Sequence, residues 1–232
     1  MSADLTDSMA AFPATVEDSR PAGLLARLWR RLQSRWSSAP IATAAELRAF
    51  VEERAALIAQ KCAIDYVRGK TGLASHALFT EKTFLDALDV CRWETFVVVL
   101  GDLLILAEGN LRPHAPAGDR ARLVEALIGL HAAAVAAQPV PGHRPDGWSD
   151  ALASFELRMR AAAAGQPKQT LDIADHSARR LFDTLPIHTR YRELDEEVVY
   201  GAVRFRMIAV NQDLGRRLRG ADVAGQLLKQ DV

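Results

Sequence analysis

The sequence predicts an all-α protein, a bundle of about six helices, and two observations support this fold class. Apolar residues recur at helical spacing in several segments, each bounded by capping residues or by Gly and Pro. No segment of useful length alternates apolar and polar residues with the period of a strand. The expected organisation is a disordered acidic tail (1–19), a basic amphipathic helix (20–37), a helical bundle domain (41–219) and a C-terminal tail (220–232).

The first two helices of the bundle have clear boundary signals. Thr43 and Glu46 form a capping box, in which each side chain accepts a backbone hydrogen bond at the start of the helix. Apolar residues at helical spacing follow, and Gly69 is expected to end this helix. Thr80 is expected to cap a long central helix that stops at Gly109.

Four more helices are expected after the central one, over segments 119–138, 149–164, 169–184 and 190–219. The last segment is ambiguous because it contains "VVYGAVRFRMIAV", which is rich in residues that favour strands. Val199, Val203 and Val210 nonetheless fall on one helical face, and the segment lacks paired turn signals. We therefore predict a helix there too.

Composition limits the class of protein. The chain has 232 residues, 49% of them hydrophobic, and a formal net charge of zero, so it can form a sizeable core and has no overall charge that attracts nucleic acid. Cys62 and Cys91 lie in apolar helical stretches and are expected to be buried, reduced thiols. The N-terminus, "MSADLTDSMA", lacks the features of a signal peptide, and no apolar run reaches the roughly 20 residues that span a bilayer. These features predict a soluble, cytoplasmic protein, and its Arg- and Ala-rich composition is typical of a GC-rich bacterium.

No catalytic or metal-binding motif is matched in full. "RGKTG" (68–72) lacks the first Gly of a phosphate-binding loop, because Ile64 stands at that position. The chain has no G-x-S-x-G elbow and no Glu-x-x-His pair, and Asp172 with His176 forms half a metal site at most. We therefore assign no catalytic residue, no metal and no cofactor, and an enzyme is the less favoured expectation.

One carboxylate interrupts the apolar run "FVVVLGDLLILAEG" (96–109). Asp102 lies about five helical turns after Phe84 and so continues the stripe that is expected to face the core. Because an unpaired buried carboxylate costs several kcal/mol, Asp102 should have a cationic partner. We prefer Arg206, on the apolar face of the last long helix, to His131, which lies too far along the next helix. The pair then fixes helix register; a functional carboxylate in a pocket and a side chain that reaches solvent are the alternatives.

The segment "GLLARLWRRLQSRW" (23–36) is the second candidate site. Its apolar residues share one helical face and its arginines occupy the flanks and the other side; the two groups are Leu25, Leu28, Trp29, Leu32 and Trp36, and Arg27, Arg30, Arg31 and Arg35. This pattern is typical of a helix that lies in a membrane interface, where Trp favours the headgroup level and arginine an anionic surface. The alternative is that the same face packs on the protein's own bundle or on a partner's helix.

Three classes of function follow, in order of preference. The first is a non-catalytic interaction or assembly protein with a protein partner, peripheral at an anionic inner membrane face; the sequence leaves self-association open. The second is a small-molecule enzyme or ligand-binding bundle that uses Asp102 and His131 as acid and base. The third is a nucleic-acid binder in which Arg216, Arg217 and Arg219 join the N-terminal arginines, and it is not favoured because no helix-turn-helix or aromatic interleaving is present.

Overall fold

A computed structural model describes residues 39–229 of the chain. Within this range no strand forms, and a single isolated bridge joins Ile41 to Leu218. The α-helices are α2 (Ala44–Thr71), α3 (Ser75–Leu78), α4 (Lys82–Leu111), α5 (Arg120–Ala136), α6 (Ser149–Ala164), α7 (Thr170–Thr184), α8 (Thr189–Arg192), α9 (Glu196–Arg217) and α10 (Gly220–Leu227). Among these described helices, six contain 15 or more residues. The predicted all-α class, with about six main helices, is therefore confirmed.

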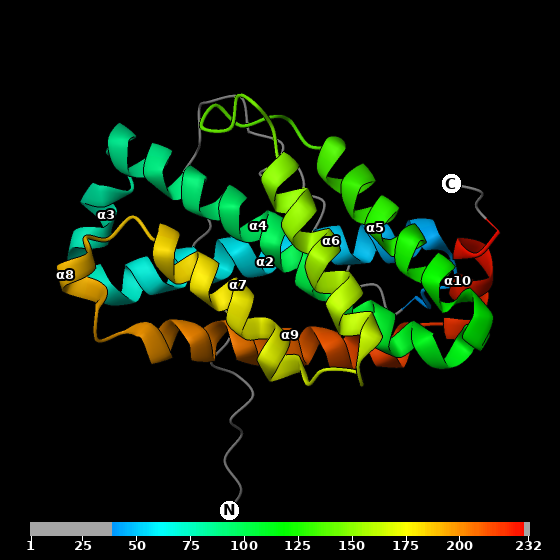
Figure 1. The fold of residues 1–232 in the computed structure, drawn as a ribbon. Coiled ribbons are helices and arrows are strands. Elements are labelled where there is room, and N and C mark those ends of the chain that lie inside the picture. Colours follow the sequence, from blue (N-terminus) through cyan, green and yellow to red (C-terminus); the bar gives the residue numbers. More distant parts are fainter. Residues whose placement is uncertain (1–38, 230–232) are drawn as a thin grey trace, which may run out of the picture.

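Helix α4 is the centre of the bundle. It packs most extensively on α2 and α7 and also contacts α5, α6, α9 and α10. Figure 1 shows it in the middle of the molecule, with α6 and α7 crossing it and α9 along the lower edge. Every residue from Trp93 to Glu108 except Val98 is buried, so this part of α4 has almost no solvent face. A helix surrounded in this way must be apolar on all sides, which explains the long apolar run.

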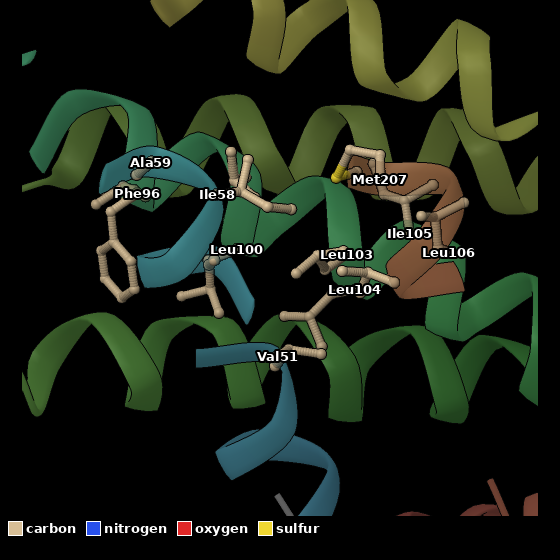
Figure 2. Close-up of a cluster of buried hydrophobic side chains, with 14 of the residues drawn as sticks. Val51, Ile58, Ala59, Phe96, Leu100, Leu103, Leu104, Ile105, Leu106 and Met207 are labelled. Carbon is tan, nitrogen blue, oxygen red and sulfur yellow. The ribbon is translucent and has the colours of Figure 1, made fainter. Parts of the chain in front are cut away.

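The core forms where α2, α4 and α9 meet. Figure 2 shows Val51 and Ile58 of α2, Leu100 and Leu104 of α4 and Met207 of α9 in one cluster. Each of these side chains is at most 1% exposed. Because full burial of a large apolar side chain stabilises a protein by about 1.5–3 kcal/mol, this cluster holds the three longest helices together.

Both cysteines are free thiols in this core. Burial raises the pKa of Cys62 to about 12 and that of Cys91 to about 11. The thiols therefore stay protonated at neutral pH and act as small apolar core residues.

Local signals predict the start of α2 but not the ends of α2 and α4. The Thr43 hydroxyl accepts from the Glu46 N–H at 3.1 Å and the Glu46 carboxylate accepts from the Thr43 N–H at 3.0 Å, so the capping box is confirmed. The predicted ends at Gly69 and Gly109 are wrong, because each helix continues for two more residues. Leu111 at the end of α4 is fully buried, and such packing outweighs the helix penalty of a glycine, about 1 kcal/mol.

Three short helices differ from the sequence expectation. Helix α3 lies in a segment expected as a loop, and α8 lies at the start of the segment expected as the last long helix. Helix α10 lies in the segment expected as a C-terminal tail. Val223, Ala224 and Leu227 of α10 are buried against the bundle. The predicted cap at Thr80 is also wrong, since its hydroxyl donates to the Ala77 carbonyl at 2.6 Å while Glu81 precedes α4.

The ambiguous segment is helical, as predicted, and forms α9. Val199, Val203 and Met207 lie on its buried face, so core packing decides against the strand that the β-branched residues favour. The end of α9 is tied to the first described residues. The Ile41 N–H donates to the Arg217 carbonyl at 2.9 Å, and the Ile41 carbonyl accepts from the Arg219 N–H at 2.8 Å.

Candidate functional site

Asp102 is completely buried and joins three helices. Its Oδ1 accepts a hydrogen bond from Nη2 of Arg158 on α6. Its Oδ2 accepts from the Ser177 backbone N–H on α7 at 3.1 Å and from the Ser177 hydroxyl. The Arg158 side chain is 24% exposed, so its guanidinium lies between the buried carboxylate and solvent.

The predicted pairing of Asp102 with Arg206 is wrong. Arg206 donates through Nη2 to Asp65 of α2 at 2.8 Å, and both side chains are partly exposed. Arg206 therefore lies on the flank of α9 that faces α2, whereas Asp102 faces α6 and α7. A sequence identifies the apolar stripe of a helix, but the crossing of the helices decides which neighbour each side of the stripe meets.

His131 is also buried, but it does not form an acid–base pair with Asp102. Its ring on α5 is 1% exposed and stacks on Phe155 of α6, with 4.0 Å between the ring centroids. Burial lowers the pKa of His131 to about 4 and the nearby Val97 carbonyl, 3.4 Å from Nε2, only partly opposes this, so the ring is neutral at pH 7. Within the described chain, His131 shares no hydrogen bond or ion pair with Asp102, and the catalytic pair of the enzyme hypothesis is not assembled.

A second buried carboxylate, Glu94, lies 8 residues before Asp102 on α4, about 12 Å along the helix. Arg144 donates to it from Nε at 2.6 Å and Nη2 at 2.9 Å, and Arg180 of α7 donates from Nη2 at 2.5 Å. Nε2 of His143 lies 3.1 Å from Oε1 of Glu94. Burial raises the pKa of Glu94, but the hydrogen bonds and charges of the two arginines more than offset this, so the pKa lies below its usual value. Glu94 therefore stays charged and ties the loop before α6 to α4 and α7.

The two carboxylate clusters border one pocket of about 250 Å³ between α6 and α7. Arg158 and His176 come from the side of Asp102, while Asp150 and Arg180 come from the side of Glu94. The wall and floor are completed by Ala151, Ser154 and Phe155 of α6, by Val97, Val98 and Gly101 of α4, and by Arg179 and Asp183 of α7. Polar and apolar side chains thus face the same space, which is typical of a small-molecule site.

An exposed apolar stripe runs along the outer side of α9. Val198 and Phe205 are seven residues, about two turns, apart on this helix and are 64% and 73% exposed. Leu194, two residues before the start of the helix, is 93% exposed. We call Leu194, Val198 and Phe205 the α9 stripe. Exposed apolar residues that share one side of a helix offer a surface that a contacting segment could cover.

The predicted amphipathic segment 20–37 lies outside the described residues, so its contacts stay a prediction. None of the helices between residues 39 and 229 is long and apolar enough to cross a bilayer.

Sequence reasoning missed the arginines that form both clusters. Arg158 lies between Phe155 and Met159, which are buried, so its place on the core-facing side of α6 carried a usable signal. Arg144 lies in the loop "PVPGHRPDGW", where no periodicity shows which way a side chain points. Arg180 was hidden because it directly follows Arg179, and the sequence does not show which of the two arginines faces α4.

No family model, no curated protein and no solved structure matches the chain.

Proposed function

We propose that this protein is a non-catalytic interaction protein in which the α9 stripe holds the basic amphipathic segment 20–37 until an anionic membrane surface or a partner helix takes its place. The observation that carries the proposal is the exposure of Leu194, Val198 and Phe205. Covering each of these side chains would contribute about 1.5–3 kcal/mol before the cost of ordering the occupant.

The charge around the stripe supports a basic amphipathic helix as the occupant. Glu193, Glu196 and Glu197 are all exposed beside Leu194 and Val198. The rim is acidic at this end of the stripe, whereas Arg204 and Arg206 flank Phe205 and Arg204 donates to Glu197 at 3.2 Å. The acidic end fits a helix that has an apolar face flanked by cations. The segment 23–36 has such a face, with two tryptophans and four arginines.

Chain connectivity supports an occupant from the same molecule. The Ala39 carbonyl accepts from Nε of Arg217 at 2.9 Å, so the described chain begins beside the end of α9. As a helix, residues 25–36 would span about 16 Å, which equals the rise from Val198 to Ala209. In a parallel arrangement, with residue 36 level with Ala209, residue 36 would lie about 12 Å from the level of Arg217. The three Cα–Cα steps from residue 36 to residue 39 can reach about 10 Å, and the Arg217 side chain supplies the remainder.

The membrane arm of the proposal follows from the same arginines. Each arginine near an anionic surface gains about 1 kcal/mol, and this attraction weakens with salt. An anionic vesicle therefore competes with α9 for segment 20–37, whereas a neutral vesicle competes far less.

Photo-cross-linking of the full chain tests the proposal. A benzophenone-bearing phenylalanine replaces Phe205, and in a matched control it replaces Leu157 of α6, which is 72% exposed. We expect position 205, and not position 157, to cross-link to residues 25–36 of the same molecule. Phosphatidylglycerol vesicles should reduce this cross-link and float the protein, whereas phosphatidylcholine vesicles should do neither.

Two variants locate the contact. Leu32→Glu places a charge on the apolar face and should abolish both the cross-link and flotation, whereas Ser34→Glu places the same charge on the opposite face and should preserve the cross-link. Equal cross-linking from positions 205 and 157, or a Leu32→Glu protein that cross-links normally, would overturn the proposal. A cross-link between two copies would instead assign the stripe to a homo-oligomer and refute the intramolecular contact.

A further inference from the structure

The pocket between α6 and α7 contains more hydrogen-bond donors than its own acceptors use. Arg158 and Arg180 each donate to a buried carboxylate through one nitrogen, Nη2. Nε of Arg180 is buried and has no hydrogen-bond partner, whereas Nδ1 of His176 lies 3.7 Å from Oδ1 of Asp102. Arg179 is exposed and makes no hydrogen bond or ion pair with any residue of the described chain. Three arginines with unused donors, Arg158, Arg179 and Arg180, therefore line one space.

Three of the four acidic side chains of the same region are already engaged. Both oxygens of Asp102 and both oxygens of Glu94 accept hydrogen bonds from protein groups. Both oxygens of Asp150 accept from Nη1 of Arg144. Asp183 stands exposed at the rim. Formal charges balance across the lining and its direct partners, so the preference for a ligand comes from the unused N–H groups and not from net charge.

Unused guanidinium donors select an oxyanion. The planar fork of an arginine matches the two oxygens of a carboxylate or phosphate, and bonds of this charged kind are stronger than those between neutral groups. Val98 and Phe155 line the same pocket and offer an apolar surface beside the arginines. A volume of about 250 Å³ lies just below the range of about 300–1,000 Å³ that is typical of drug-sized ligands, so the ligand should be small.

We infer that this pocket binds a small organic oxyanion, with its acid group against Arg158, Arg179 and Arg180 and its apolar part against Val98 and Phe155. The site is separate from the α9 stripe, because α6 and α7 supply its walls and no residue of the stripe lines it. If the pocket does not bind an oxyanion, the proposed function of the α9 stripe is unaffected.

Isothermal titration of the full chain with phenyl phosphate, at low ionic strength, tests the inference. We expect saturable binding of one equivalent, tighter than the binding of inorganic phosphate because the ring contacts the apolar wall. Benzamide, which is neutral, should not bind. Arg179→Gln should weaken phenyl phosphate binding at least tenfold, since a hydrogen bond to a charged group is lost.

The control variant is Arg120→Gln on α5, which is exposed and lies outside the pocket. It removes the same charge and should bind phenyl phosphate like the natural protein. Arg179 makes no hydrogen bond or ion pair among residues 39–229, so its replacement should leave the circular dichroism and thermal unfolding unchanged. Absence of phenyl phosphate binding, or equal binding by the two variants, would overturn the inference. Equal binding of benzamide would show an apolar pocket without anion selectivity and would overturn it as well.

Discussion

Replacing Asp102 with alanine removes a carboxylate that has no access to solvent. Arg158 then loses its anionic partner, and two donors of Ser177 lose their shared acceptor. Breaking a buried pair by removing one partner typically costs about 3–5 kcal/mol. The Arg158 side chain is 24% exposed and can turn towards water, so we expect a loss near the lower end, about 3 kcal/mol.

A double-mutant cycle in urea, followed by circular dichroism at 222 nm, measures the pairing directly. Asp102→Ala and Arg158→Ala should each destabilise the protein, and the double variant should cost less than the sum by about 2 kcal/mol. The control cycle uses Arg206→Ala, whose guanidinium pairs with Asp65. Asp102→Ala and Arg206→Ala should be additive within about 0.5 kcal/mol. Unchanged stability of Asp102→Ala, or coupling to Arg206 in place of Arg158, would refute the description of this site.

Three further changes test other parts of the structure by the same unfolding assay. Glu94→Gln should cost about 3 kcal/mol because Glu94 is buried among cations, whereas Asp150→Asn, at a carboxylate that is 62% exposed, should cost less than about 1 kcal/mol. Folding lowers the pKa of His131 from its unfolded value near 6.5 to about 4. Between these two pH values the unfolded chain binds a proton at His131 that the folded chain does not bind. Stability should fall by about 3 kcal/mol between pH 6.5 and 4, and His131→Gln should remove most of that slope above pH 4.5. A Cβ on Gly101 would lie 2.7 Å from the buried Phe155 ring of α6, so Gly101→Ala should destabilise the protein by about 1–3 kcal/mol. Gly129 has open space around it, so the control Gly129→Ala should stabilise the protein by about 0.5–1 kcal/mol. The opposite order of the two glycine variants would contradict the close approach of α4 and α6.

One feature that depends on neighbouring residues, the capping box of α2, was predictable from the sequence, whereas the cap predicted at Thr80 is not formed. Thr43 and Glu46 are three residues apart, and the bonds between them form whatever the rest of the chain does. The ends of α2 and α4 depend instead on distant packing. Asn110 illustrates this, because its side-chain amide donates to Leu106 at 2.8 Å and to Asn211 of α9 at 3.1 Å, which holds the last turn of α4 in place.

The candidate site was predictable only in part. An acid inside an apolar run indicated that Asp102 would be buried, because the helix around it had no polar face. Its partner depended on which helices cross α4 at that level, and the spacing of residues along one helix contains no such information. Glu94 escaped notice for a related reason. It stands between Trp93 and Thr95 near charged residues, and only the fold shows that this part of α4 is enclosed.

The buried ion pairs of α4 are better explained by the pocket than by stability. Replacing a buried ion pair with apolar residues of similar size is often neutral or stabilising, so holding α6 and α7 against α4 does not require Asp102 and Arg158. Apolar side chains at these positions would pack together, whereas the ion pair gives the pocket a polar wall. We therefore predict that, in urea, the double variant Asp102→Leu, Arg158→Met is more stable than Asp102→Ala by about 2 kcal/mol. The same double variant should bind phenyl phosphate at least tenfold more weakly than the natural protein. A double variant that regains stability and still binds normally would show that the pair serves only to set the position of the helices.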